Sequence, residues 1–455
     1  MTSYRPDPKI LELGPDFYDA VAPAAFPKCT PRFLNRRWAS EVGLDLDEAA
    51  WSGHFCRFEP LPGNLTEPLA LRYHGHQFRV YNPDIGDGRG FLFAQLRDGD
   101  NRLLDLGTKG SGQTPYSRRA DGRLTLKGGV REVLATEMLE ALGINTSKSF
   151  ALFETGEELE RGDEPSPTRS AVLTRLSHGH IRIGAFQRLA FFGETENIAK
   201  LVRYCLEHLY AERPGASDAD DALRLFDLVS AKTATLAASY LAAGFVHGVL
   251  NSDNINVTGE SFDYGPWRFT PDWNPEFTAA YFDHYGLYAF GRQPEAIHWD
   301  LAQLGGCLTL IADEPALSDL LAGWSARFEA ALADAMARRL GVIPSSEIAA
   351  PLITALATRE VAIDRIFFDW RGGRDPGPNR YPSAAFRALA KSLEGRERPQ
   401  SHPYWSDANP CSMHIDEVEA IWSAIADRDD WQPFDDKVNA VRRMGDAMRA
   451  DAPKA

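Results

Sequence analysis

Two neighbouring stretches, His247-Gly-Val-Leu-Asn-Ser-Asp-Asn254 and Asp263-Tyr-Gly265, indicate the fold and the chemistry of this chain. They follow an apolar segment with helical periodicity and bring carboxylates and amides into one polar loop. Mg²⁺ takes such oxygens as ligands and leaves its other positions to water and phosphate. Asn254 and Asp263 therefore suit a metal ion, and Asp253 suits a proton acceptor for an attacking hydroxyl.

The order of these residues is that of the catalytic and metal-binding loops of protein kinases. His247 and Asn254 keep the kinase spacing, but the position of the kinase catalytic Asp holds Val249. A chain that keeps the metal ligands and moves the base to Asp253 is not expected to carry out ordinary γ-phosphoryl transfer. Asn and Asp also favour turns through local hydrogen bonds, so the loop alone leaves a purely structural turn open.

Length and charge exclude several classes of protein. The 455 residues carry a net charge of −15, which argues against non-specific nucleic-acid binding. No run approaches the ~20 apolar residues of a membrane span, and the N-terminus has no targeting pattern. The five cysteines have no metal-ligand spacing, so we expect inert thiols in a reducing compartment. We therefore expect a cytoplasmic protein with no nucleic-acid or membrane partner.

Upstream of the central loop, the pattern predicts a β-hairpin that ends in a glycine-rich, basic stretch. Its strands lie at 91–96 and 103–106 around an Asp98-Gly99 turn. Between Arg102 and Arg131, seven basic residues accompany two acidic ones, although the chain is acidic overall. A local basic island of this kind suggests an anionic ligand. Short glycine-rich matches also occur in plain surface turns, so the glycines alone do not distinguish a ligand-binding loop from a solvated turn.

The next segments supply further candidates for the same site. A helix is predicted over 129–142, and Glu132 in its first turn could pair with Lys109, as the helix glutamate of a kinase pairs with the strand lysine. The helix dipole alone would also favour a glutamate there. Arg175 and Arg182 lie on either side of a His/Gly turn and could reach phosphates, although surface arginines are more often only solvated.

Taken together, several stretches resemble the selenoprotein O family of kinase-like protein adenylyltransferases, in its bacterial form without selenocysteine. They occur in order between about residues 73 and 310: Tyr73-His-Gly-His-Gln-Phe78, Gly86-Asp-Gly-Arg89, Lys109-Gly-Ser-Gly-Gln-Thr-Pro-Tyr-Ser-Arg118, Asp121-Gly-Arg123, His180-Ile-Arg-Ile-Gly184, the two central stretches with Pro266, and Gln293-Pro294. Chance agreement of this many short motifs is improbable. After about residue 370 the match is weak.

The resemblance implies an α+β, protein-kinase-like bilobal fold with a β-rich N-lobe, a helical C-lobe and an extra helical C-terminal region. We expect an N-terminal wrapping arm with a short helix over 1–65 and the N-lobe with its nucleotide-binding loops over 66–205. The C-lobe with the catalytic and metal loops is expected over 206–340, and the helical extension over 341–455. A regulatory disulfide from the segment 277–284 to the C-terminus, which some relatives have, is not expected because this segment has no cysteine.

The resemblance also implies that ATP lies reversed, so that its α-phosphate faces the acceptor. AMP would pass to a Ser, Thr or Tyr hydroxyl of a protein, or of the enzyme itself, and pyrophosphate would leave. It assigns the nucleotide to Gly86, Gly88, Arg89, Lys109, Asp121, Gly122, Arg175, Arg182 and Asp263. Glu132 would pair with Lys109, Asp253 would be the proton acceptor, and Asn254 and Asp263 would bind Mg²⁺ or Mn²⁺.

Two other functions stay open on the sequence alone. The first is a kinase that passes the γ-phosphate of ATP to a protein or a small molecule, with Asp253 as its base. The second is a catalytically inactive, nucleotide-binding pseudokinase scaffold that signals by its conformation.

Overall fold

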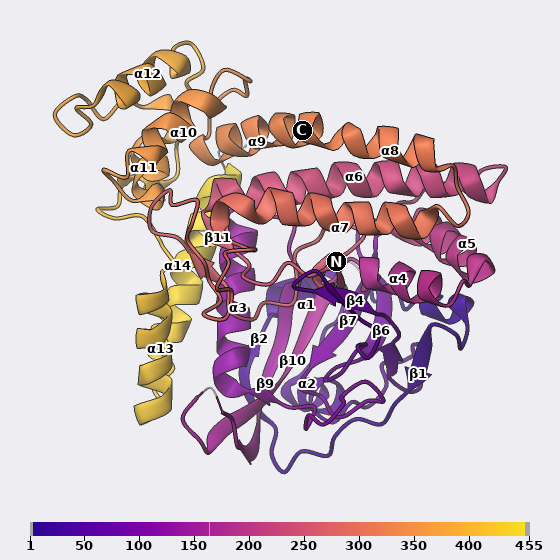
Figure 1. The fold of residues 1–455 in the computed structure, drawn as a ribbon. Helices are drawn as coiled ribbons and strands as arrows, with labels where there is room; N and C mark the ends of the chain where they lie inside the picture. The colour runs from indigo at the N-terminus through magenta and orange to yellow at the C-terminus, as the bar shows by residue number, and fades with distance from the viewer. Residues whose placement is uncertain (1–2, 163, 451–455) are drawn as a thin grey trace.

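The computed structural model describes residues 3–162 and 164–450, and residues 18–177 contain an eight-stranded antiparallel β-sheet (Figure 1). The strands follow the order β1-β3-β6-β7-β10-β9-β2, and β8 pairs with β10. Their bounds are β1 (Tyr18–Ala20), β2 (Thr30–Leu34), β3 (Leu69–Leu71), β6 (Leu92–Arg97), β7 (Leu103–Lys109), β8 (Leu124–Thr125), β9 (Lys148–Leu159) and β10 (Thr168–Ser177). The chain thus combines an antiparallel sheet with separate helices, in agreement with the expected α+β class.

The predicted hairpin is confirmed as β6 and β7. The Asp98 carboxylate closes its turn by accepting the backbone N–H groups of Asp100 and Arg102 at 3.0 and 2.8 Å. Every residue of β7 is buried, because alternate side chains enter two different cores. Leu103 belongs to the core that includes most of the helices, whereas Leu104 belongs to the core that includes the N-terminal residues.

The N-terminal segment is more than the predicted wrapping arm with one helix. It supplies β1 and β2, which are the two ends of the sheet, and the helices α1 (Arg36–Glu41) and α2 (Glu48–Phe55). Trp51 of α2 is buried against Phe150 of β9, with ring centroids 5.1 Å apart. These contacts make the segment part of the core beneath the sheet.

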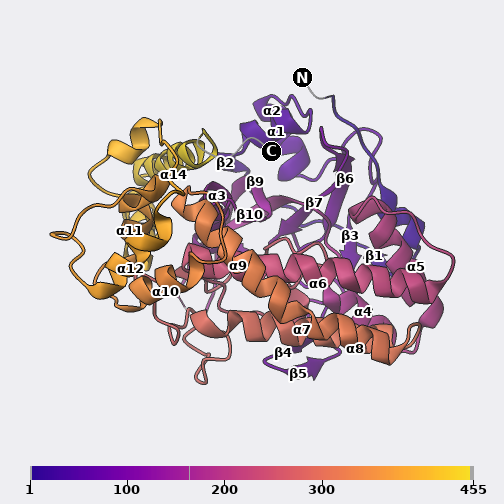
Figure 2. The same cartoon turned by 90° about the horizontal axis from the view of Figure 1, so that it is seen from above.

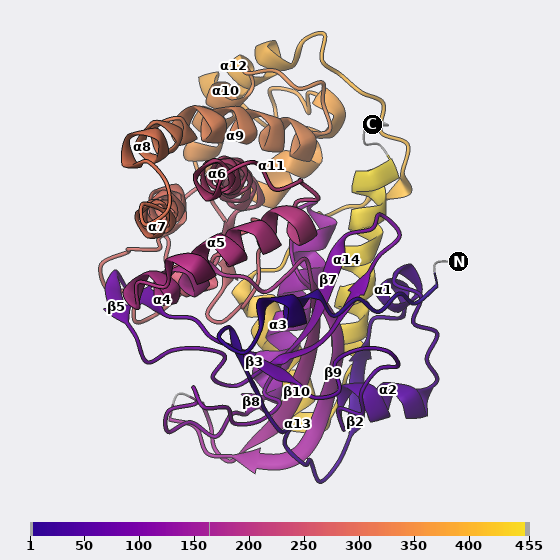
Figure 3. The ribbon, with the colours of Figure 1, turned by 90° about the vertical axis from the view of Figure 1, so that its right-hand side faces the viewer.

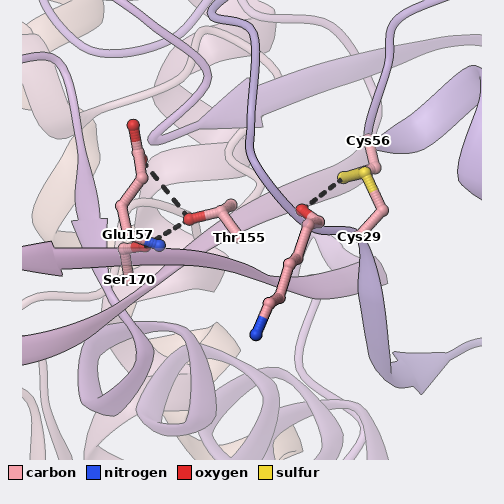
Figure 4. The surroundings of a disulfide bond; sticks show 6 residues. Cys29, Cys56, Thr155, Glu157 and Ser170 are labelled. Carbon is pink, nitrogen blue, oxygen red and sulfur yellow. Dashed lines mark hydrogen bonds between the residues drawn. A yellow bond between two sulfur atoms is a disulfide. The ribbon is translucent and has the colours of Figure 1, made fainter.

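Cys29 and Cys56 form a disulfide in this N-terminal segment, with their Cα atoms 6.0 Å apart (Figure 4). The expectation that all five cysteines are thiols is therefore wrong for these two. A pair 27 residues apart has no sequence signature, because only the fold brings β2 and α2 together. The cysteine pattern consequently gives no argument for a reducing compartment. Cys205, Cys307 and Cys411 are free.

Helix α3 (Leu126–Ala141) crosses one face of the sheet and carries Glu132. It begins earlier than predicted because the Thr125 hydroxyl caps it, accepting the Gly128 N–H at 3.1 Å. Helix α14 (Gln432–Ala450) packs against α3, as Figure 3 shows. An ion pair joins the two helices, with Arg442 Nε 2.7 Å from Glu137 Oε2. The end of the described chain thus supports the helix that presents Glu132.

The helices after the sheet form a layer in which α6 packs against α7 and α9 (Figure 1). Helix α6 (Asp218–Ala243) begins at the Ser217 cap and ends at Gly244, whose φ of 69° only glycine adopts readily. The others before residue 345 are α4 (Ile183–Phe191), α5 (Thr195–Tyr204), α7 (Gln293–Leu308), α8 (Glu314–Ala322) and α9 (Trp324–Leu340). No helix in the described ranges is long and apolar enough to cross a membrane.

The C-terminal helices gather at one end of the molecule, as Figure 2 shows. They are α10 (Ala349–Ala357), α11 (Ile363–Asp369), α12 (Ala384–Leu393), α13 (Ile415–Arg428) and α14. The remaining short elements are β4 (Gly75–Gln77), β5 (Val80–Asn82), β11 (Phe245–Val246), β12 (Arg268–Phe269) and the helical turns η1 (Lys9–Leu13), η2 (Cys205–Leu209), η3 (Ser252–Asn254), η4 (Phe290–Arg292), η5 (Arg371–Gly373) and η6 (Pro403–Ser406). The turn η3 carries Asp253 and Asn254.

Candidate functional site

A cavity of about 340 Å³ lies between the sheet and the two loops that follow α6. It is walled by the glycine-rich connection from β3 to β6, the segment 116–120, and single side chains from β7, β10 and the central loops. Eight of the predicted site residues line it: Gly86, Gly88, Arg89, Lys109, Arg175, Arg182, Asp253 and Asp263. The fold therefore gathers residues from most of the predicted motifs around one space.

His247 connects the two central loops. Its side chain is fully buried, and its Nε2 lies 3.0 Å from the Phe262 carbonyl oxygen. Its backbone N–H donates to Gln293 of α7 at 3.0 Å. Burial lowers the pKa of His247, so the ring is neutral and donates from Nε2 to the carbonyl. This contact holds the residue before Asp263 close to the loop that carries Asp253.

Four charged side chains form a buried cluster at the inner end of the cavity. Lys109 of β7 pairs with Glu132 of α3, and its Nζ lies 2.9 Å from Asp263 Oδ1. Arg175 of β10 bridges the same two carboxylates, with Nη2 2.7 Å from Glu132 Oε1 and 2.9 Å from Asp263 Oδ1. Glu132, Lys109 and Arg175 are each less than 5% exposed. The sequence suggested the first pair, but not that Arg175 would complete a closed network.

These cations set the charge of Asp263. Burial by itself would raise the pKa of the Asp263 carboxyl, but Lys109, Arg175 and Arg182 hold it well below its usual range. Asp263 is therefore ionised and available as an anionic oxygen ligand. Its backbone has a φ of 62°, an uncommon conformation for a residue other than glycine, at the start of the Asp263-Tyr-Gly265 turn.

Asp253 has the opposite character. Its side chain is buried, and its Oδ1 has no hydrogen-bond partner among the described residues. Burial raises the pKa of this carboxyl to about 6, against the attraction of Arg182. Arg182 also holds the backbone of the turn that carries Asp253, because its Nη1 donates to the Asp253 carbonyl oxygen at 2.9 Å. Oδ1 lies against Gly75, while Asp253 as a residue lines the cavity, so its carboxylate is placed to accept a proton from a bound hydroxyl.

Asn254 does not line the cavity, but a hydrogen bond fixes the orientation of its side-chain amide. Its Nδ2 donates to the Val249 carbonyl oxygen at 3.0 Å, which leaves Oδ1 as the free ligand atom. No group of three His, Cys, Asp or Glu side chains within 3–162 and 164–450 could hold a metal ion. Asn254 and Asp263 offer two hard oxygens, which fits Mg²⁺ that takes its other ligands from water and phosphates.

Asp121 and Gly122 do not line the cavity either. Asp121 is exposed and pairs with Arg161, whose Nη1 is 2.8 Å from Oδ2. Gly122 has a φ of 70°, and a Cβ atom there would lie 2.2 Å from the Gly112 carbonyl oxygen. Only glycine therefore allows the two turns to touch. Both residues border the segment that includes Arg118, which does line the cavity.

Two residues of the site were not singled out from the sequence. Asp87 lies between the predicted glycines, and its carboxylate accepts the Leu71 N–H at 3.0 Å and contacts Arg182 at 3.3 Å. The Tyr73 ring lies under the Arg182 guanidinium, 4.5 Å from it. Both belong to stretches that the resemblance covers, so their motifs gave a signal. Their contacts with Arg182 could not be read from the sequence.

Several known proteins are similar to this chain over nearly its whole length. A family model described as protein adenylyltransferase SelO matches residues 1–374. The chain is 38% identical to the protein nucleotidyltransferase YdiU of Synechocystis sp., over 96% of this chain and 97% of that one. It is 42% identical to the protein of the same name from Gloeobacter violaceus, over 96% and 95%. The likeness therefore extends well beyond the span of the motifs, and the chain belongs to the SelO family of protein adenylyltransferases.

Proposed function

We propose that this protein transfers AMP from ATP to Ser, Thr or Tyr hydroxyls of proteins and releases pyrophosphate. The observation that carries the proposal is the position of Asp253. Val249 occupies the place of the kinase base, whereas Asp253 lines a cavity with three buried cations. The chain belongs to the SelO family of protein adenylyltransferases, and adenylyl transfer is the reaction that we assign to this arrangement of residues.

The triphosphate would bind along the basic wall of the cavity. Lys109, Arg175 and Arg182 are held rigidly by Glu132, Asp87 and Asp263, so they need little reorganisation when phosphates arrive. Gly86, Gly88 and Arg89 supply a close backbone approach and one more cation. Asp121 and Gly122 remain predicted nucleotide contacts, through the segment that borders the cavity.

In the transfer step, Asp253 accepts the proton of the acceptor hydroxyl. The hydroxyl oxygen forms a bond to the α-phosphorus, and the bond from that phosphorus to the oxygen it shares with the β-phosphorus breaks. The electron pair leaves with pyrophosphate, and the three cations offset its charge. Asn254 and Asp263 would hold Mg²⁺ or Mn²⁺, which when bound supplies further neutralisation of phosphate charge.

This function implies a kinase-like bilobal arrangement of the chain. We assign residues 66–205 to an N-lobe with nucleotide-binding loops and 206–340 to a C-lobe with the catalytic and metal loops. We assign residues 1–65 to an N-terminal segment, whose described part supplies β1 and β2, and residues 341–455 to a C-terminal extension, whose described part is mostly helical. The described part of that extension supports α3 through α14.

The test uses the purified protein, Mg²⁺, a generic protein acceptor, and α-labelled or γ-labelled ATP in parallel tubes. We expect label on protein from the α-phosphate alone, and none from either nucleotide with Asp253→Asn. Glu140→Gln, on the outer side of α3, serves as the control that should retain transfer. Label from the γ-phosphate alone would refute adenylyl transfer and indicate a kinase. Nucleotide-dependent stabilisation without any label would indicate an inactive scaffold.

A further inference from the structure

A second cavity, with a volume of about 510 Å³, lies on the other side of the connection between the sheet and α4. The two cavities share no lining residue. The connection at residues 178–182 separates them, because His178 lines the second cavity and Arg182 lines the first. The proposed transfer reaction makes no use of this second space.

The second cavity is walled by both parts of the fold. The turn between β6 and β7 and the residues after α3 form one side. Helix α6, the end of η2 and Arg338 of α9 form the other. A molecule bound there would touch the sheet and the helical layer at the same time.

The charge of this cavity is opposite to that of the chain. Arg97, Arg102, Lys232 and Arg338 line it, together with the single carboxylate of Asp100. The protein as a whole carries a net charge of −15. A cationic cavity in an acidic protein concentrates anions rather than cations.

Two of these cations have no protein counter-charge. Arg97 pairs with Asp7 at 2.8 Å, and Arg102 pairs with Asp98 at 2.7 Å. Lys232 and Arg338, by contrast, form no ion pair and no side-chain hydrogen bond with any residue in the described ranges. Both are exposed to the cavity solvent. They come from neighbouring helices that pack together, and both line this one cavity.

The rest of the wall suits a small organic phosphate. Asn101, Asn145 and Ser239 offer hydrogen-bonding groups, while Tyr210 and Leu236 offer apolar surface. Burial lowers the pKa of His178 to about 4, and Arg102 and Lys232 act in the same direction, so its ring is neutral and can hydrogen-bond to a ligand. The volume lies in the range of small-molecule sites.

We propose that this second cavity binds a phosphate-bearing small molecule, with Lys232 and Arg338 as its principal charge contacts. The shared chemistry is a phosphate group with at least two negative charges. A nucleotide and an inorganic polyphosphate both offer it, and the experiment separates them.

Binding of inorganic pyrophosphate and of AMP is measured by calorimetry on the full chain and on the variant Lys232→Glu/Arg338→Glu. We expect the wild type to have one more binding site than the variant, or the variant to bind at that site about tenfold more weakly or worse. The control is Arg57→Glu/Lys391→Glu, which changes the net charge equally at two exposed cations outside both cavities. It should bind both probes as the wild type does.

The two probes identify the source of the phosphate. Loss of pyrophosphate binding alone indicates an inorganic chain, loss of AMP binding alone indicates that the base or ribose contributes, and loss of both indicates that the phosphate group is recognised. The proposal is refuted if Lys232→Glu/Arg338→Glu binds both probes with the stoichiometry and affinity of the wild type. AMP transfer by this variant is measured separately, so a failure here is distinguishable from a failure of the proposed function.

Discussion

Replacing Glu132 by glutamine tests whether the buried charge cluster holds the site together. Glu132 has a relative exposure of 0% and accepts hydrogen bonds from Lys109 and from two nitrogens of Arg175. Glutamine keeps the shape of the side chain but removes its charge. Among the described residues, Asp263 would then be the one carboxylate that pairs with Lys109 and Arg175.

The expected cost follows from the burial of the cations. Removing one partner of a buried ion pair costs about 3–5 kcal/mol, because the other charge remains desolvated. A domain typically has only about 5–15 kcal/mol of stability, so Glu132→Gln should be severely destabilised. Bound ATP supplies negative charge to the same cations. At about a hundredfold excess over its Kd, ATP should raise the free energy of unfolding by about 2.7 kcal/mol.

The assay is urea unfolding of the wild type and Glu132→Gln, with and without ATP and Mg²⁺. Glu140→Gln is the matched control, since Glu140 is on the same helix but pairs with Arg37, whose side chain is 38% exposed. Arg37 stays in contact with solvent when the Glu140 charge is removed, and glutamine still offers an oxygen to the Trp38 N–H, so the change should cost about 1 kcal/mol. A free energy of unfolding for Glu132→Gln within about 1 kcal/mol of the wild type would refute the reasoning.

Four further predictions follow from the same contacts. Asp253→Asn should lower AMP transfer about 10²- to 10⁴-fold in a steady-state assay while thermal stability is kept, and wild-type rates would contradict its role as the proton acceptor. Arg442→Ala leaves the buried Glu137 carboxylate unpaired, so it should cost about 1–3 kcal/mol in urea unfolding and expose α14 to protease; unchanged cleavage would contradict this. The pKa of His178 is lowered from 6.5 to about 4, so the unfolded state binds the proton first and the free energy of unfolding decreases as the pH falls from about 6.5 toward 4. In unfolding curves measured over this pH range, His178→Gln should make the decrease smaller by up to about 3 kcal/mol. Chelation of divalent cations should abolish transfer, and added Mg²⁺ or Mn²⁺ should restore it in the wild type but only weakly in Asn254→Ala.

Much of the fold could be predicted from local sequence patterns. The Asp98-Gly99 turn between two apolar runs predicted the β6–β7 hairpin, and the periodicity before Gly244 predicted α6. Within the expected C-lobe, α8 and α9 are separated at Gly323, and periodicity alone cannot show such a bend between two helices. The two edge strands of the sheet were missed because β1 and β2 are short and become strands only by pairing with β3 and β9.

The candidate site was predictable where its residues fall in contiguous motifs. The Gly86-Asp-Gly-Arg89 stretch, Lys109 and the two central loops line one cavity or border it. Contacts between distant segments could not be predicted, such as Arg175 completing the Glu132 cluster or α14 resting on α3. The Cys29–Cys56 disulfide was missed for the same reason.

The central claim is that this site passes AMP, and not phosphate, to a protein hydroxyl. The most direct measurement is mass spectrometry of an acceptor protein after incubation with ATP, Mg²⁺ and either the wild type or Asp263→Ala. The account predicts an AMP adduct on a Ser, Thr or Tyr side chain with the wild type and none with Asp263→Ala. A phosphate adduct with the wild type, or an AMP adduct that persists with Asp263→Ala, would contradict it.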